Sequence, residues 1–149
     1  MPIETLKKNE IAYLAGLIDG DGGFYVYRIP TISKNTGKQV VNFQCYIKYT
    51  STNFEVIKWV HDKIGATSIY QQKPVKNRPF EKMVYHSQVT GEKLDKLLPL
   101  LMPYLIIKKR NAEIMHQIRQ TYVKRKESGK QRVSDEIIAI RESLVIQLR

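Results

Sequence analysis

Cysteine is almost absent from this sequence of 149 residues, in which Cys45 is the only one. A single cysteine excludes an intramolecular disulfide framework and a zinc site built from cysteines, and it favours a reducing compartment. The first residues, MPIE, lack the charged and apolar regions of a signal peptide. The most apolar segment, Leu97–Ile107, is too short to cross a bilayer and contains two prolines. We therefore expect a soluble, intracellular protein, cytoplasmic or organellar, with no membrane partner.

Acidic residues are also scarce. The sequence has 14 Asp and Glu against 25 Lys and Arg, which gives a formal net charge of +11. Such an imbalance favours association with an acidic polymer or surface and says nothing about the fold. Nucleic acid is the first expectation, and a basic protein with a merely solvated surface is the alternative. The length suits one compact domain, so we expect residues 1–149 to form a single domain.

Hydrophobic spacing and turn residues predict alternating helices and hairpins. Asn9 is a candidate cap for a helix that begins at Glu10 and ends near Asp19, and Ser134 is a candidate cap for the last helix. Between them the patterns predict strands at 24–31 and 39–49, a helix at 53–64, strands at 67–72 and 82–89, and helices at 91–101, 109–126 and 135–148. Hairpins joined by helices favour an α+β fold with an antiparallel sheet and helices on one face.

The segment Leu14–Phe24 reads LAGLIDGDGGF and ends a helix in two aspartates. An EF-hand loop counted from Asp19 fails after two ligands, because its fifth position is Gly23 and its twelfth is Pro30. A dinucleotide-binding fingerprint fails as well, because the third glycine is missing and a helix precedes the strand. Small residues instead recur along the helix at spacings that predict a close helix–helix seam. They are Ala12, Ala15, Gly16 and Gly20.

The helix ends in Asp19-Gly20-Asp21-Gly22, whose carbonyl and carboxylate oxygens could hold a hard cation. For a word this short, an Asp-Gly turn leading into a strand would be the simpler interpretation. The whole word Leu14–Gly22 is present, however, and it resembles the signature of the LAGLIDADG homing endonucleases, differing only in Gly20 for alanine. The predicted order of helices and hairpins is similar to that family's fold as far as Ser128 and less so beyond it.

The resemblance implies an α-β-β-α-β-β-α core with a saddle-shaped antiparallel sheet for DNA. It also implies a motif helix at about 9–20 and a basic helical extension at about 124–149. Family members with one motif act as homodimers that pack their motif helices together, and we find no second motif in this sequence. Such a dimer implies a roughly palindromic DNA site. The residues expected at the dimer interface are Ala12, Ala15, Gly16 and Asp19.

The same resemblance implies a metal site. Asp21 matches the metal-binding carboxylate of the family, with the Gly20 carbonyl as its companion ligand. Phosphate oxygens and water would complete the shell that Mg²⁺ prefers. Asp19 lies two residues earlier, so its side chain is expected to diverge from Asp21 and to hold the turn.

Two lysines are expected near that metal. Lys108 matches the family's catalytic lysine, which follows a proline-aromatic segment, and Lys109 or Arg110 takes the role if the register slips by one residue. An ordinary lysine at the start of a basic helix is the alternative for Lys108. Lys48 resembles the position where relatives carry a polar active-site residue, often glutamine.

Strand alternation separates Phe43, Cys45 and Ile47, which we assign to the core, from side chains that would face DNA. The expected base-reading side chains are Tyr25, Tyr27, Asn42, Gln44, Tyr46, Tyr70 and Gln72. The expected phosphate contacts are Arg28, Lys34, Lys38, Arg78, Lys124, Arg125, Lys130 and Arg132. Solvated surface charges are the alternative for this second set. The three histidines show no metal-binding spacing and are assigned to the surface or the core; they are His61, His86 and His116.

Together these features predict a site-specific homing endonuclease that makes a staggered double-strand break by Mg²⁺-dependent phosphodiester hydrolysis. Mn²⁺ is expected to replace Mg²⁺, Ca²⁺ to support binding without cleavage, and no small-molecule cofactor to take part. The alternative is a LAGLIDADG protein that binds nucleic acid without cutting it, either an intron RNA maturase or a DNA-binding regulator. Relatives that lose cleavage commonly lose the metal carboxylate, so the presence of Asp21 favours cleavage.

Overall fold

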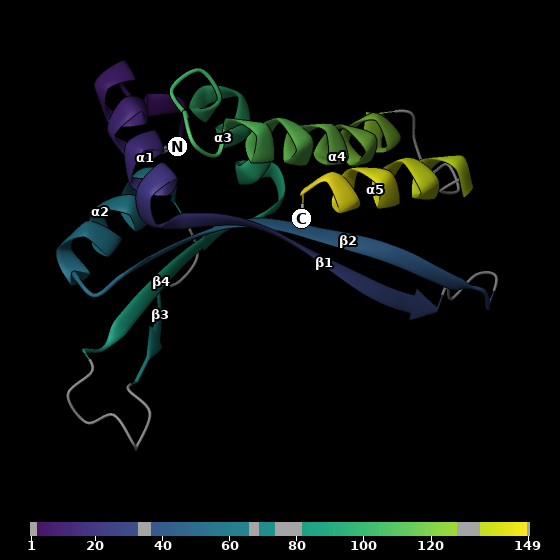
Figure 1. The fold of residues 1–149 in the computed structure, drawn as a ribbon, viewed down its shortest axis with the longest axis horizontal. Coiled ribbons are helices and arrows are strands. Elements are labelled where there is room, and N and C mark those ends of the chain that lie inside the picture. Colours follow the sequence, from purple (N-terminus) through teal and green to yellow (C-terminus); the bar gives the residue numbers. More distant parts are fainter. Residues whose placement is uncertain (1–2, 33–36, 66–68, 74–81, 128–134, 149) are drawn as a thin grey trace.

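The computed structural model describes residues 3–32, 37–65, 69–73, 82–127 and 135–148, without the side chains of residues 40, 123–127 and 135. In chain order the elements are η1 (Ile3–Thr5), α1 (Lys8–Asp21), β1 (Gly22–Ile32), β2 (Gln39–Ser51), α2 (Phe54–Ile64), β3 (Ile69–Gln72), β4 (Val84–Val89), α3 (Gly91–Leu101), α4 (Lys109–Glu127) and α5 (Asp135–Leu148). The helices gather on one side of the strands (Figure 1).

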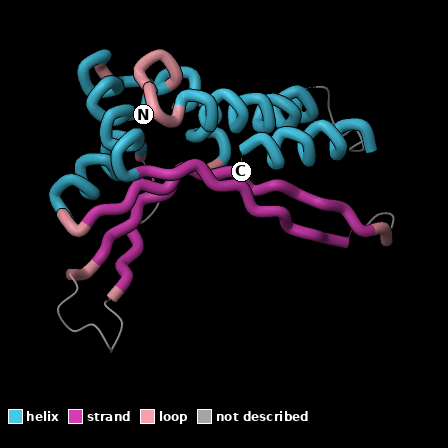
Figure 2. Tube along the Cα trace, in the orientation of Figure 1, coloured by secondary structure: helices cyan, strands magenta, loops and turns pink. Residues whose placement is uncertain are grey.

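The four strands form one antiparallel sheet in the order β1-β2-β4-β3. β1 pairs with β2 along its whole length, from Gly22 opposite Tyr49 to Ile32 opposite Gln39. The central pairing of β2 with β4 is shorter and involves only Ile47–Ser51 of β2. The two hairpins therefore diverge from a common centre and arch beneath the helices (Figure 2).

Strand alternation gives the sheet two different faces. Phe24, Phe43 and Ile47 are buried on the side of the helices, where they join the fully buried leucines and isoleucines of α1 and α3 in one core. Among the described residues no helix covers the other side, and we call it the open face (Figure 1). Its side chains include those of Tyr25, Tyr27, Asn42, Gln44, Tyr46, Lys48, Thr50, Tyr70, Gln72, His86 and Gln88.

Polar contacts connect the helices to one another and to the sheet. Arg141 of α5 is fully buried, donates from Nε to Thr121 Oγ1 at 2.8 Å, and lies 3.6 Å from the centre of the Tyr122 ring. The Tyr122 hydroxyl accepts the backbone N–H of Phe43 at 2.8 Å, which joins α4 to β2. The long hairpin is therefore supported from above by α4 and α5.

The predicted α+β fold is confirmed, but the predicted start of the first helix is wrong. Asn9 does not cap α1, because the helix begins earlier, at Lys8, and the Lys7 N–H donates to Glu10 Oε1 at 3.0 Å. The cap predicted at Ser134 lies outside the described residues. None of the helices described is both long and apolar enough to cross a membrane.

Candidate active site

The last turn of α1 carries Asp21, which is exposed at the helix terminus. The helix closes with a hydrogen bond from the Gly22 N–H to the Ile18 carbonyl. A Cβ at Gly22 would lie 2.8 Å from Ile18 Cα and 2.9 Å from its carbonyl oxygen, so no larger residue fits there without a shift of the backbone. The glycine thus allows the chain to leave the helix directly into β1 beside Asp21.

The carboxylate of Asp19 holds the loop between α3 and α4 against the end of α1. Its Oδ2 accepts the backbone N–H groups of Ile106 and Ile107 at 2.7 and 3.2 Å, and its Oδ1 accepts that of Lys108 at 2.9 Å. Burial acts to raise the pKa of Asp19, but the three amide hydrogen bonds outweigh it and hold the pKa below its usual value. Asp19 therefore stays ionised and fixes a residue far away in sequence next to the motif.

Lys108 is attached to the same turn through its side chain. Its Nζ donates to the carbonyl oxygens of Ile18 and Asp19 at 3.1 and 2.9 Å, where a cation also complements the negative end of the helix dipole. The carbonyl of Gly20, the next along the helix, is not among the partners of Lys108 in the described part of the chain. The structure thus brings Lys108, Gly20 and Asp21 together at one helix end.

Two residues of β2 lie opposite the start of β1 and so close to this helix end. Lys48 pairs with Gly23 and places its Nζ 5.0 Å from the centre of the Tyr25 ring on the open face. Tyr49 pairs with Gly22 on the other face and is buried. Burial, followed by the negative charge of Asp21, raises the pKa of Tyr49, which therefore remains a hydroxyl donor. The sequence interpretation assigned no role to Tyr49.

The small residues of α1 do not all lie on one accessible surface. Gly16 and Gly20 are exposed, and a Cβ built on either would contact nothing within 4 Å. Ala12 is half-buried, whereas Ala15 has 0% exposure and belongs to the core of its own protomer. The assignment of Ala15 to a dimer interface is therefore corrected, since a residue already enclosed cannot contact a second helix.

The donor set at the end of α1 suits a divalent cation shared with other groups. Among the described residues, no group of three or more His, Cys, Asp or Glu side chains could hold a metal by itself. One exposed carboxylate and one helix-terminal carbonyl are hard oxygen ligands, which match the preference of Mg²⁺ for one or two carboxylates plus phosphate and water. The residues present fit a site that substrate oxygens complete.

Three tyrosines form a stack on the open face. The ring centres of Tyr25 and Tyr27 lie 5.2 and 5.3 Å from that of Tyr46, which is only 4% exposed, while Tyr27 is 58% exposed. Burial, followed by a hydrogen bond with Tyr27, raises the pKa of Tyr46. Tyr46 lies on the predicted face but is covered by its neighbours, so its assignment as a base-reading residue is corrected.

Arg28 lies on the wrong side of the sheet for the predicted phosphate contact. It alternates with Tyr27 and shares the helix-side face of β1 with Phe24 and Val26. Its guanidinium Nη2 lies 2.6 Å from Glu142 Oε1 of α5. The ion pair holds Arg28 against the helices, away from the open face, which corrects the prediction.

The structure describes some of the remaining residues predicted to contact DNA and leaves others out. Asn42, Gln44, Tyr70 and Gln72 are exposed on the open face, and Lys38 is exposed near the tip of the long hairpin. The side chains outside the description are those of Lys34, Arg78, Lys124, Arg125, Lys130 and Arg132.

Three polar residues of the open face were missed by the sequence interpretation. Thr50 of β2 lies directly opposite His86 of β4, and Gln88 lies directly opposite Lys48, two residues further along each strand on the same face. The register of β4 shows that all three side chains point to the same face of the sheet as Lys48. That register is a long-range property, so the only signal in the sequence was the polar character of these residues.

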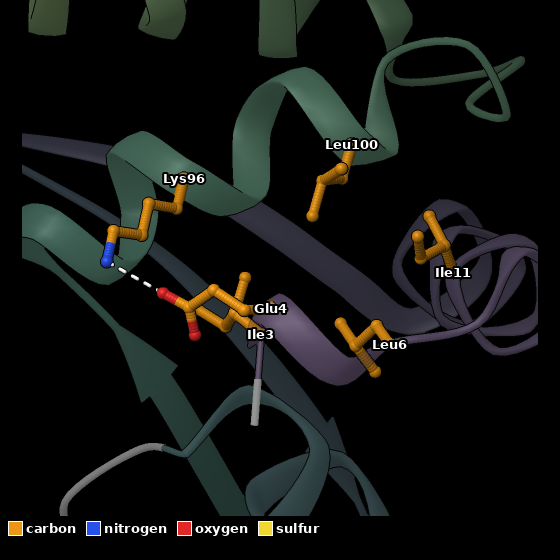
Figure 3. A pocket seen from close by; sticks show the side chains of 6 residues that line it. All are labelled: Ile3, Glu4, Leu6, Ile11, Lys96 and Leu100. Carbon is orange, nitrogen blue, oxygen red and sulfur yellow. Dashed lines mark hydrogen bonds and ion pairs between the residues drawn. The ribbon is translucent and has the colours of Figure 1, made fainter. Parts of the chain in front are cut away.

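An apolar cavity of about 470 Å³ lies among the helices and is distinct from this site. Figure 3 shows its aliphatic lining and the pair at its rim, in which Lys96 Nζ lies 2.8 Å from Glu4 Oε1. Ile11 is its contribution from α1, ten residues before Asp21, which corresponds to about 15 Å along the helix axis. Its two charged groups neutralise each other, so the cavity offers no reactive group.

Comparisons with known proteins identify the family and the fold. A family model described as LAGLIDADG endonuclease matches residues 14–133. The homing endonuclease I-CvuI, crystallised with its target in the presence of 2 mM Ca, superposes with a TM-score of 0.69 at 16% identity over 95% of this chain and 80% of that chain. For I-TnaI the TM-score is 0.72 at 14% identity, over 96% and 88% of the two chains.

A longer protein matches as well. The meganuclease I-SmaMI, bound to uncleaveable DNA, gives a TM-score of 0.67 at 16% identity over 93% of this chain but only 44% of that chain. Comparison with curated protein sequences gave no match. At these identities the structural likeness establishes the fold.

Proposed function

Because this chain belongs to the LAGLIDADG endonuclease family, we propose that it is a homodimeric, site-specific homing endonuclease that hydrolyses double-stranded DNA. The observation that carries the proposal is the exposed Asp21 at the end of α1, beside Lys108 and at the edge of an open sheet face. The formal net charge of +11 supports a polyanionic substrate.

The dimer forms through the exposed glycines of α1. Gly16 and Gly20 have open space where a side chain would be, so a second copy of α1 can approach closely along them. A two-fold interface of this kind brings the ends of both α1 helices, and hence both Asp21 carboxylates, to the symmetry axis. I-SmaMI is long enough to hold two such units in one chain, since this chain covers 44% of it.

DNA lies along the open face of each protomer. A two-stranded β-ribbon fits the major groove, where Gln and Asn side chains pair with adenine and Lys pairs with guanine. Gln44, Asn42 and Gln72 are exposed there and are the proposed base readers. Because the two protomers are related by symmetry, the recognised site is roughly palindromic.

Each end of α1 then serves one strand of the DNA, and the two cuts are staggered. Asp21 and the Gly20 carbonyl would hold a divalent cation such as Mg²⁺, which would supply positive charge next to the phosphate and lower the pKa of a bound water. Lys108, held by the α1 carbonyls, directs its remaining proton toward the charge that develops on the phosphate. Lys48 adds a second positive charge on the side of the open face.

The decisive experiment uses a plasmid that carries the joined flanks of the site where this gene is inserted. We expect the purified protein to linearise it in Mg²⁺ and to leave it intact without divalent metal. Asp21→Asn should abolish cleavage and leave DNA binding largely unchanged, because it removes a ligand and adds no bulk. Cleavage by Asp21→Asn at the normal rate would refute the site.

Binding without cleavage would favour the alternative function, a nucleic-acid binder. The plasmid assay is therefore paired with a gel-shift assay on the same DNA and on the intron RNA. Tight binding of the RNA with no cut in the DNA would identify a maturase instead. Sedimentation of the DNA complex should give two chains, and one chain per site would refute the dimer.

A further inference from the structure

His86 lies at the centre of a hydrogen-bonded group on the open face. Its Nδ1 lies 2.8 Å from Thr50 Oγ1, and its Nε2 lies 3.1 Å from Gln72 Oε1. The three side chains come from three strands, because β4 lies between β2 and β3 in the sheet. Both ring nitrogens are thus engaged, and the ring is half-buried.

These bonds determine how the neutral imidazole is protonated. The amide oxygen of Gln72 accepts only, so Nε2 must carry the hydrogen and donate it. Nδ1 is then the acceptor of the Thr50 hydroxyl. In this state the NH₂ group of Gln72 and the lone pairs of Thr50 Oγ1 remain available to a molecule on the open face.

Protonation of His86 would change that pattern. With both nitrogens donating, Thr50 Oγ1 must accept from Nδ1 and release its own hydrogen, so it becomes a donor to the open face. A positive charge would also appear beside Lys48. The same three residues therefore offer two different hydrogen-bond patterns, depending on one proton.

We propose that His86 is a positioning residue for base recognition, which holds Gln72 and Thr50 in one orientation and makes the sequence preference of the protein depend on pH. The proposal rests on the proposed function, since it assigns a role on the surface that would read DNA. It concerns specificity and not the chemical step, because Gln72 and Thr50 present their polar atoms on the open face, where the bases would be read.

The surroundings of His86 favour the neutral form at neutral pH. Burial and then the positive charge of Lys48 lower the pKa of His86 below its usual value. The titratable groups that face it on the neighbouring strands are Lys48 of β2 and Tyr70 of β3. Lys73 and Lys82 lie just beyond the ends of β3 and β4 and add positive charge at that end. The helices pack on the opposite face.

The test measures preference among DNA sequences with the full chain and no divalent metal, so that bound DNA stays intact. A randomised duplex pool is selected on the wild-type protein at about pH 8, where histidine is neutral. The affinity for the selected duplex is then compared with that for a scrambled duplex of equal length. The variants are His86→Phe, Gln72→Ala and the double variant, and Gln71→Ala on the opposite face of β3 is the matched control.

We expect His86→Phe and Gln72→Ala each to reduce the ratio of the two affinities about tenfold, the discrimination that one good base contact provides. The double variant should lose no more than His86→Phe alone, because His86 acts on the DNA through Gln72 and Thr50. The control Gln71→Ala should keep the wild-type ratio. The wild-type ratio should fall as the pH is lowered through the acid range below the usual histidine pKa of about 6.5, while that of His86→Phe stays flat.

Additive losses in the double variant, or the same pH profile in wild type and His86→Phe, would overturn the proposal. Nitrogen NMR of the free protein gives a second reading, in which His86 should appear at neutral pH with its hydrogen on Nε2. The opposite tautomer would also overturn it. Failure of the proposed DNA recognition, on which this role rests, is seen separately, because the wild-type protein would then select no sequence from the pool.

Discussion

The end of α1 and the open face of the sheet are built in opposite ways. At the helix end, Asp19 and Lys108 are bonded to backbone groups, so their geometry depends on the path of the chain. On the open face, Gln44 and Tyr27 project outward from a regular hairpin. The first arrangement is suited to chemistry that must stay constant, and the second to a surface whose side chains can change without altering the fold.

Apart from Asp21→Asn, Lys108→Met gives the largest effect expected at the helix end. Removing one donor aimed at developing charge lowers the cleavage rate by about 10²–10³-fold, while DNA affinity changes little because one of many charges is lost. Single-turnover cleavage and a gel shift measure the two quantities. Cleavage at full rate would weaken the contrast between the two regions, since the lysine bonded to the backbone of α1 would then take no part in the chemistry.

Tyr46→Ala tests whether the buried tyrosine of the open face stabilises the folded protein. Tyr46 is buried beneath Tyr25 and Tyr27, so its removal should lower the free energy of unfolding by about 3 kcal/mol. Tyr27→Ala is the matched control, and it should weaken DNA binding with a smaller loss of stability because Tyr27 is exposed. Urea unfolding measures the loss of stability in each variant. Equal losses would show that Tyr46 contributes no more to folding than the exposed Tyr27.

Asp19→Ala should destabilise the folded protein by about 1–2 kcal/mol, because the N–H groups of Ile106, Ile107 and Lys108 lose a charged acceptor. The pKa of Asp19 is lowered in the folded state, so its stabilisation is present above about pH 4, the value in unfolded chains, and is lost as the pH falls through the lower folded value. Urea unfolding of wild type and Asp19→Ala should therefore converge in acid. A constant difference at all pH values would contradict the role of the carboxylate.

Gly22→Ala and Gly16→Leu compare two glycines of the same motif. The first introduces a clash with the Ile18 backbone and should cost about 1–2 kcal/mol of folding stability. The second fills open space, so the monomer should stay folded while the proposed dimer dissociates. Thermal unfolding and sedimentation separate the two outcomes; a stable dimer of Gly16→Leu would show that α1 does not form the interface.

The order of elements could be predicted because periodicity and breakers are local. Asn53 caps α2 by accepting the N–H groups of Glu55 and Val56, and Gly65 ends that helix with a φ of 74°, as the sequence indicates. The cap predicted at Asn9 was wrong because neighbouring residues can each end up at the start of a helix. Here the helix starts one residue earlier, and Glu10 accepts the backbone N–H of Lys7.

The sequence predicted site residues only where they belong to the motif or follow the alternation of a strand. Alternation already placed Phe24 and Val26 on the inner face, and the same parity would have placed Arg28 with them. It could not reveal that the neighbouring tyrosines cover Tyr46, because burial depends on three dimensions. Nor could it show that Asp19 binds amides that lie 87 to 89 residues away.

The long hairpin also sets a length. β1 contains 11 residues, and at about 3.3 Å per residue it extends for about 36 Å. One turn of B-form DNA is about 34–36 Å, so under the proposed function a single hairpin would extend along about one turn of the DNA. Two such hairpins placed end to end across a symmetry axis would span about two turns, or roughly 20 base pairs. A sequence of that length occurs by chance so rarely that most genomes would contain a single recognition site for this protein.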